Sequence, residues 1–378
     1  MGKQITRLSP PTDFSRFDEI IDVRSPSEYS EDHIGGAINL PVLDDRERAE
    51  IGTIYKQVSP FQARKQGAAL VSRNVARHLE DHFAGKPRDY SALLYCWRGG
   101  QRSGSMATVL SEVGWNISLV KGGYKAYRRV VLAAFEEWAP DLPLVVLNGY
   151  TGAGKTLVLE ELARRGARVI DLEGLARHKG SVFGGDPENP QPPQKRFESL
   201  LYDALREMRE TGSDDSDRPE PVFVEAESAK IGRLNLPNPL WQRMKVSPVI
   251  ELDSPLAARA DYLTRDYAEW VGDRGRVEET LERLRKFHSA ETLGRWKDLA
   301  ARREWRTLVA ELLEQHYDVK YTVDGSGHFR KPSRSVPLGS HEPDAVAACA
   351  ARLREIAPEL LASETEVETS PPLSTPPA

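Results

Sequence analysis

The sequence has few cysteines, no long apolar run and little net charge. Its two cysteines, Cys96 and Cys349, lie far apart, which argues against a disulfide framework. No stretch approaches the roughly 18 apolar residues of a membrane helix, and residues 1–5 lack the apolar segment of a secretory signal. We therefore expect a cytoplasmic protein with reduced thiols and no membrane contact. Because the net charge is only −5, nucleic-acid binding would need a local basic patch.

The rest of the composition is that of a soluble globular protein long enough for two or three domains. Hydrophobic residues make up 39% and charged residues 29% of the 378 positions. Alternating strand and helix patterns predict a parallel-sheet α/β domain over residues 1–138 and a second α/β domain over 139–254. A helical, basic extension is expected over 255–332. Over 333–378 we expect order to fade apart from a helix near 344–356, with a disordered tail from 363.

Residues 149–156 fit the pattern G-x-x-x-x-G-K-[ST] of a phosphate-binding P-loop and have the surroundings that this pattern needs. An apolar strand pattern over 144–147 precedes them, and helical spacing over 157–165 follows. In such a loop the backbone N–H groups converge on phosphate oxygens, Lys155 reaches the outer phosphate, and Thr156 holds a metal or another oxygen. The sequence therefore predicts a di- or triphosphate site made of Gly149, Tyr150, Thr151, Gly152, Ala153, Gly154, Lys155 and Thr156.

Two other segments are candidates for supporting this site. The apolar strand pattern over 221–224 brings Glu225 and Glu227 to the place where a Walker-B acid would lie. Because these acids are Glu rather than Asp, a bound Mg²⁺ is optional in this prediction. A basic, glycine-rich segment supplies His178, Lys179 and Ser181, although His178 fits an ordinary loop histidine equally well. The sequence shows no metal-ligand cluster, so we predict no resident metal and no prosthetic group.

A second chemical centre is predicted at Cys96, which follows an apolar strand pattern over 90–95 and precedes helical spacing over 104–113. At the carboxyl edge of a parallel sheet, loop N–H groups and a helix dipole favour a thiolate. A buried structural cysteine is the alternative, and it fits a loop with two Arg and two Gly poorly. Cys349, in an alanine-rich stretch, is predicted to be a packing residue. The predicted anion loop comprises Trp97, Arg98, Gly99, Gly100, Gln101, Arg102 and Ser103.

The first domain resembles the rhodanese family, in which a loop cysteine carries a sulfane sulfur or selenium. The resemblance rests on residues 22–24 (Asp-Val-Arg), residues 33–39 (His-Ile-Gly-Gly-Ala-Ile-Asn) and the Cys96 loop. The spacing in this chain is C-x5-R, where many rhodaneses have C-x4-R. The longer spacing is also that of rhodanese-fold phosphatases, although these usually carry a His where this chain has Tyr95. A wider cradle would also suit selenophosphate.

The predicted helices over 255–316 contain a basic stretch with interleaved aromatic residues. Eight cations face three acids between residues 283 and 306. Cations suit RNA phosphates, and exposed aromatic rings stack on unpaired bases. The alternative is a solvated helix face with the Trp rings in the core, and the stretch taken alone favours that alternative. The candidate RNA contacts are Arg283, Arg285, Lys286, Arg295, Trp296, Lys297, Arg302, Arg303 and Arg306.

The two domains together resemble the bacterial tRNA 2-selenouridine synthases over about residues 14–325, with connecting segments such as 58–64 and 225–228 included. The resemblance implies a transferase that geranylates wobble 2-thiouridine from geranyl diphosphate and then replaces the S-geranyl group by selenium from selenophosphate. It implies that the P-loop of a P-loop NTPase-like domain holds the diphosphate, that Cys96 takes the selenium, and that the basic helices grip the tRNA anticodon stem-loop. The enzyme that produces selenophosphate is then a candidate partner. Arg177 and Lys179 flank His178 where the family pattern has Asn and Arg.

Two other functions are compatible with the same residues. One is an ATP-dependent enzyme in which the P-loop activates a tRNA for sulfur delivery from Cys96, although the missing Walker-B Asp weighs against it. The other is a rhodanese-fold phosphatase fused to a nucleotide-binding module, which would need no RNA.

Overall fold

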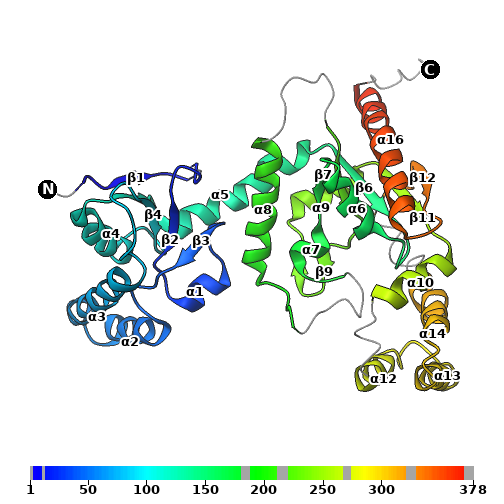
Figure 1. The fold of residues 1–378 in the computed structure, drawn as a ribbon, viewed down its shortest axis with the longest axis horizontal. Helices are drawn as coiled ribbons and strands as arrows, with labels where there is room; N and C mark the ends of the chain where they lie inside the picture. Colours follow the sequence, from blue (N-terminus) through cyan, green and yellow to red (C-terminus); the bar gives the residue numbers. More distant parts are fainter. Residues whose placement is uncertain are drawn as a thin grey trace, which may run out of the picture. The chain divides into compact units, whose positions relative to one another are not determined.

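The computed structural model describes residues 3–10, 13–179, 188–210, 220–266, 274–320 and 329–369, which form two compact units (Figure 1). The first unit comprises Met1–Glu137 together with Pro192–Asp203, and the second comprises Trp138–Gln191 together with Ala204–Ala378. Each unit contains its own parallel sheet, which confirms the expected α/β class. Among the described residues, no helix is both long and apolar enough to cross a membrane.

The sheet of the first unit has five parallel strands, and the Cys96 loop leaves from its central strand. The outermost strand β1 was not predicted, because Thr6 and Arg7 give it no apolar pattern and both are exposed. The strands lie in the order β1 (Thr6–Leu8), β5 (Asn116–Val120), β4 (Ser91–Tyr95), β2 (Glu19–Asp22) and β3 (Ala37–Asn39).

Helices complete the first unit, and local capping explains where two of them begin. The side chain of Asp44 accepts a hydrogen bond from the backbone N–H of Glu47, in the first turn of α2, which has no partner within the helix. Ser59 caps the next helix in the same way, with Pro60 at its first position. The helices are α1 (Pro26–Glu31), α2 (Asp45–Gln57), α3 (Pro60–Asp81), α4 (Gln101–Val113) and α5 (Gly123–Trp138).

The segment Pro192–Asp203 belongs to the first unit, although we expected all of 139–254 in the second domain. It includes the first turns of α8 (Gln194–Glu210), where Ser199 donates a 2.8 Å hydrogen bond to the buried carboxylate of Asp32. Glu198 forms an ion pair with Arg128 of α5. These polar contacts within the first unit involve residues far apart in the sequence, which is why the pattern of the chain did not reveal them.

The second unit is built on another five-stranded parallel sheet, with the P-loop strand at its centre. This unit begins with a short 3-10 helix, Ala139–Asp141, with Ala139 and Leu142 buried. The strands lie in the order β12 (Arg334–Pro337), β11 (Val249–Asp253), β6 (Leu144–Asn148), β8 (Val222–Glu225) and β7 (Arg168–Ile170). The helices are α6 (Lys155–Arg164), α7 (Leu172–Ala176) and α9 (Asn238–Val246), with a small hairpin of β9 (Lys230–Ile231) and β10 (Leu234–Asn235).

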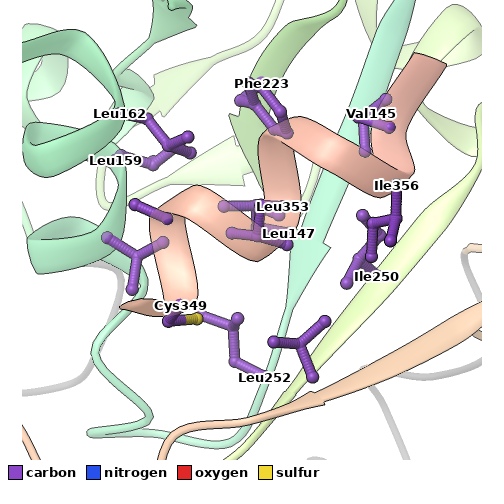
Figure 2. Close-up of a cluster of buried hydrophobic side chains, with 14 of the residues drawn as sticks. Val145, Leu147, Leu159, Leu162, Phe223, Ile250, Leu252, Cys349, Leu353 and Ile356 are labelled. Carbon is purple, nitrogen blue, oxygen red and sulfur yellow. The ribbon is translucent and has the colours of Figure 1, made fainter. Parts of the chain in front are cut away.

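The C-terminal segment is part of this core, and the expectation that order fades beyond Ser333 is wrong. Strand β12 pairs with β11, and α16 (Pro343–Thr369) extends well past the predicted helix into the stretch expected to be disordered. Figure 2 shows Cys349, Leu353 and Ile356 of α16 among side chains of the sheet and α6. Cys349 is thus a packing residue, as predicted, and burial raises the pKa of its thiol to about 11. Residues 370–378 of the predicted tail lie outside the described residues.

The helical extension has a small core of its own. Leu281, Leu293, Trp296 and Leu308 are buried together where three of its helices meet. The later helices of the extension pack back on its first helix, α10, which follows strand β11 of the sheet. The elements are α10 (Leu256–Asp266), α12 (Arg274–Arg283), α13 (Ala290–Ala301), α14 (Trp305–Leu312), a π-helical turn (Leu313–Tyr317) and α15 (Asp318–Lys320).

Candidate functional site

Cys96 lies at the carboxyl end of β4, where the strand gives way to the loop that leads into α4. Its Sγ accepts hydrogen bonds from the backbone N–H of Gly100 and from the Oγ of Ser103, both at 3.3 Å. Two donors thus point at the sulfur, where negative charge gathers when a thiol acts as a nucleophile. Because Cys96 is buried, oxidants dissolved in the solvent have little access to this sulfur.

Close packing against the start of α5 fixes the shape of the Cys96 loop. A Cβ atom on Gly123 would lie 2.2 Å from the carbonyl oxygen of Cys96 and 2.4 Å from the nitrogen of Gly99. Both glycines also have positive φ angles, 60° at Gly123 and 63° at Gly99, which other residues adopt only at a cost. The loop and the helix start therefore approach each other at a distance that only glycine permits.

The two arginines of the loop have different surroundings. Arg102 donates through both terminal nitrogens to Glu28, at 2.6 and 3.2 Å, so its charge is largely compensated. Burial alone would raise the pKa of Glu28, but the hydrogen bond and charge of Arg102 outweigh it and lower that pKa. Arg98 is exposed at the rim of a cavity beside the loop. Arg98 is thus the better placed of the two to meet an incoming anion.

The P-loop has the predicted order of strand, glycine-rich turn and helix start. Gly149, Gly152 and Gly154 all have positive φ angles, of 155°, 78° and 86°, and α6 begins at Lys155. Lys155 donates from Nζ to the carbonyl oxygen of Gly149 at 3.0 Å, so its ammonium group lies across the loop. The arrangement supplies convergent N–H groups and one positive charge for a phosphate.

Acidic side chains line one side of this loop. Thr156 donates to a carboxylate oxygen of Glu173 at 3.2 Å, and the backbone N–H of Glu173 donates to Glu225 at 2.6 Å. Burial first, and then the charge of nearby Asp171, raise the pKa of Glu225 well above its ordinary range. Burial and the charge of Glu173 raise the pKa of Glu227 to about 8. Both shifts favour the protonated form of these acids, which reduces their repulsion of a bound polyanion.

Glu173 and two further side chains were missed by the sequence analysis. Arg259 of α10 is buried, donates from Nη1 to the carbonyl oxygen of Thr151 at 3.2 Å, and forms a bidentate ion pair with Asp318 at 2.7 and 2.9 Å. His341 lies against the loop as well, with a ring atom 2.7 Å from where a Cβ on Gly154 would be. Arg259 and His341 lie far from residues 149–156 in sequence, and none of the three residues belongs to a local motif, so no sequence signal identified them.

Two of the remaining candidates around the P-loop, His178 and Lys179, make contacts within the fold through the backbone and the side chain, respectively. The backbone N–H of His178 donates to the carbonyl oxygen of Glu173 at 3.0 Å, and burial lowers the pKa of its ring. Lys179 forms a 2.6 Å ion pair with Asp266 at the end of α10. Ser181 lies outside the described residues. Among the described residues, no group of three or more His, Cys, Asp or Glu side chains is arranged to hold a metal ion.

Comparison with known proteins identifies both units. Residues 10–129 match the model of the rhodanese-like domain, and residues 142–291 match that of the tRNA 2-selenouridine synthase AAA domain. The tRNA 2-selenouridine synthase of Nitrosomonas europaea is 36% identical over 271 residues, which cover 70% of this chain and 68% of the relative. The proteins of that name from Bdellovibrio bacteriovorus and Chromohalobacter salexigens are 41% and 35% identical, covering 64% and 86% of their own lengths. The chain belongs to the tRNA 2-selenouridine synthase family.

The structure reduces the set of predicted RNA contacts on the helical extension. Trp296 is fully buried in the core of the extension, so its prediction as a base-stacking residue is wrong, and the alternative of a Trp ring in the core holds for it. Five of the cations form ion pairs with acids that lie outside residues 283–306 and were therefore not included when the charges of this stretch were counted. These pairs are Arg283–Glu279, Arg285–Glu282, Arg295–Glu311, Lys297–Glu282 and Arg306–Asp261. Lys286, Arg302 and Arg303 are exposed and keep their place as candidate contacts.

Proposed function

We propose that this chain is a tRNA-modifying transferase that converts wobble 2-thiouridine to 2-selenouridine. Its relatives carry the name of that activity, over 68% of the length of one and 86% of another. The observation that carries the proposal is the pairing, in one chain of this family, of a phosphate cradle at Lys155 with a hydrogen-bonded thiol at Cys96. Each centre suits one half of a two-step exchange of sulfur for selenium.

The first step is geranylation at the P-loop. The thiocarbonyl sulfur attacks C1 of geranyl diphosphate, the C–O bond breaks with its electron pair on oxygen, and diphosphate leaves, while N3 of the base loses its proton to water. Loop N–H groups and Lys155 stabilise that charge as it develops. The raised pKa values of Glu225 and Glu227 reduce the repulsion that these acids exert on the diphosphate. A Mg²⁺ ion, when present, would be held by Thr156 and Glu173, whose side-chain oxygens lie 3.2 Å apart.

Geranylation prepares the base for the second step. A thiocarbonyl sulfur is a poor leaving group, whereas an alkylated sulfur departs as a thiol and makes C2 electrophilic. The P-loop then need not hydrolyse a nucleotide, because its cradle serves the diphosphate of the geranyl donor. Selenophosphate and geranyl diphosphate are co-substrates in this scheme, and no prosthetic group takes part.

The second step uses Cys96 to release selenium from selenophosphate, and in this scheme Cys96 takes the phosphoryl group rather than the selenium that the family resemblance implied. Selenium has the same oxidation level in selenophosphate and in 2-selenouridine, so an S–Se bond on Cys96 would need an oxidant and later a reductant. Attack of the thiolate on phosphorus needs neither: an S–P bond forms, the P–Se bond breaks, and selenide leaves with the electron pair. Selenide attacks C2 and expels geranyl thiol, and water then cleaves the S–P bond to give phosphate and free thiol.

The tRNA is the macromolecular substrate, and its anticodon stem-loop is the segment that must reach both centres. Lys286, Arg302 and Arg303 are candidate contacts for its phosphates, and the wobble base would be splayed out of the loop. The enzyme that makes selenophosphate is a candidate protein partner, because it would deliver a reactive donor directly.

Mass spectrometry of wobble nucleosides tests the proposal with purified full-length protein and 2-thiouridine tRNA, in the absence of ATP. Geranyl diphosphate alone should give the S-geranyl nucleoside, and both co-substrates together should give 2-selenouridine. A mass change that appears only after ATP is added would contradict the role of the P-loop and favour ATP-dependent sulfur transfer. No change under any condition, with release of phosphate from aryl phosphates, would favour the phosphatase alternative.

A further inference from the structure

A large cavity lies beside the Cys96 loop, within the first unit. Gly100, Gln101 and Arg102 of the loop form one wall, and the helix pair α2–α3 forms another. Its volume is about 1170 Å³, which is above the roughly 300–1,000 Å³ that hold a drug-sized ligand. A selenophosphate ion is a single tetrahedral anion and would fill only a small part of this space. The cavity therefore has room for a ligand larger than selenophosphate.

The lining of the cavity combines positive charge with apolar surface. None of the described residues that line it is acidic, although Glu28 of α1 pairs with two of its cations, Arg48 and Arg102. The lining cations are Arg7, Arg48, Lys56, Arg64, Arg98 and Arg102. The apolar part consists of Leu43, Ile51, Tyr55, Ala63, Ala68 and Val71. Phosphate groups favour the cations, and a hydrocarbon chain favours the apolar wall.

We propose that this cavity binds the S-geranyl wobble nucleotide, with its flanking phosphates on the cations and the geranyl chain against Ile51, Tyr55 and Val71. The inference rests on the proposed function, because that function makes a geranylated nucleotide the substrate of the Cys96 loop. An anionic ligand with one long apolar substituent needs both kinds of wall, and this lining has both. Binding the departing geranyl thiol in the same apolar wall also keeps the leaving group clear of the selenide.

Two variants on one helix test whether the positive charge of the cavity contributes to RNA binding. Arg64 and Arg73 both lie exposed on α3, and each donates from Nε to the carbonyl oxygen four residues earlier, at 3.3 and 3.5 Å. Only Arg64 lines the cavity. Arg64→Gln should therefore weaken RNA binding and flatten its salt dependence, and Arg73→Gln should change neither.

Two further variants test whether the apolar wall binds the geranyl chain. Tyr55 and Phe61 are both exposed aromatic residues of the α2–α3 pair, at 56% and 65%, but only Tyr55 lines the cavity. Because both rings are largely exposed, replacing either by Ser should leave the fold intact. Tyr55→Ser should reduce the preference for a geranylated ligand, and Phe61→Ser should leave it unchanged.

The test compares anticodon stem-loop RNAs that carry S-geranyl- or S-methyl-2-thiouridine, using full-length protein without selenophosphate. Fluorescence anisotropy should show that the wild type binds the geranyl RNA at least about tenfold more tightly. Tyr55→Ser and Ile51→Thr should lower this ratio without weakening binding of the methyl RNA. An unchanged ratio in both variants, or no preference in the wild type, would overturn the inference.

The same two RNAs are then converted with selenophosphate, which separates this inference from the proposed function. If 2-selenouridine forms but the variants keep the wild-type preference in binding and in kcat/KM, the cavity assignment fails and the proposed function stands. If the binding ratio responds as expected but no 2-selenouridine forms, the cavity binds the ligand and the proposed reaction fails. The binding measurement thus tests the cavity assignment whether or not the reaction takes place.

Discussion

At the scale of single residues, Cys96 divides the proposed reaction into two separable halves. Replacing Cys96 by Ala removes the nucleophile but leaves the P-loop in the other unit untouched. We expect Cys96→Ala to abolish formation of 2-selenouridine and to leave geranylation near the wild-type rate, as measured by mass spectrometry of wobble nucleosides. Equal loss of both products in a well-folded variant would contradict this division.

Ser103 offers a graded version of the same experiment. Its Oγ donates to Sγ of Cys96 at 3.3 Å, whereas the exposed Thr53 of α2 donates only to the carbonyl oxygen of Ala49, at 3.0 Å, and does not line the cavity. Ser103→Ala should slow selenation about 10–100-fold, because it removes a hydrogen bond to the nucleophilic sulfur that is worth about 1.5–3 kcal/mol when the acceptor is charged. Thr53→Ala is the control and should leave the rate unchanged, so equal effects of the two variants would indicate a purely structural role.

Glu227 gives a prediction in which the sign of the pH dependence matters. Its pKa is raised from the ordinary 4.5 to about 8, so between these values the folded chain keeps a proton that the unfolded chain has lost. The free energy of unfolding therefore falls as pH rises from about 4.5 to about 8. Glu227→Gln cannot ionise and should remove this fall, so its Tm relative to wild type should be higher at pH 8 than at pH 5.

Thermal unfolding across this pH range measures the effect, and each kcal/mol should correspond to a Tm shift of roughly 2–4 °C. Glu210→Gln is a suitable control, because Glu210 is exposed at the end of α8. A difference between Glu227→Gln and wild type that is the same at pH 5 and pH 8 would show that Glu227 ionises normally.

At the scale of elements, α16 matters more than its sequence suggests. Leu353 is fully buried between the helix and the sheet, so Leu353→Ala should lower the free energy of unfolding by about 2–5 kcal/mol. Glu355→Ala, on the exposed side of the same helix, should change it by less than about 0.5 kcal/mol. Chemical denaturation measures both, and similar small effects would mean that α16 is not part of the cooperative core.

The same element shows where sequence patterns are insufficient. The alanine-rich run around Cys349 predicts a helix, but a helix of small residues gives no sign of the surface that it covers. Strand β12 has only four residues, with Arg334 and Pro337 at its ends, so it carries too little pattern to be recognised as a strand. Its place beside β11 depends on pairing across more than eighty residues of chain, which local propensity does not encode.

At the scale of the whole molecule, the two chemical centres were predictable because each is a local motif at the end of a strand. The glycine-rich turn at Lys155 and the loop at Cys96 both have strand, turn and helix within about twenty residues. The parts that depend on distant chain segments were not predictable. Arg259 reaches the P-loop from α10, and Glu28 pairs with Arg102 from α1, so neither has a neighbour in sequence that signals its role.

Because each unit has its own sheet and core, one centre can be disabled without harm to the other. Lys155→Ala should block geranylation and Cys96→Ala should block selenation, so neither variant alone should make 2-selenouridine from 2-thiouridine tRNA. A mixture of the two should make it, because geranylated tRNA released by one variant is a substrate for the other. If each variant performs its remaining half-reaction but the mixture yields only the S-geranyl nucleoside, the intermediate does not leave the chain that made it, and the two steps occur in a single binding event.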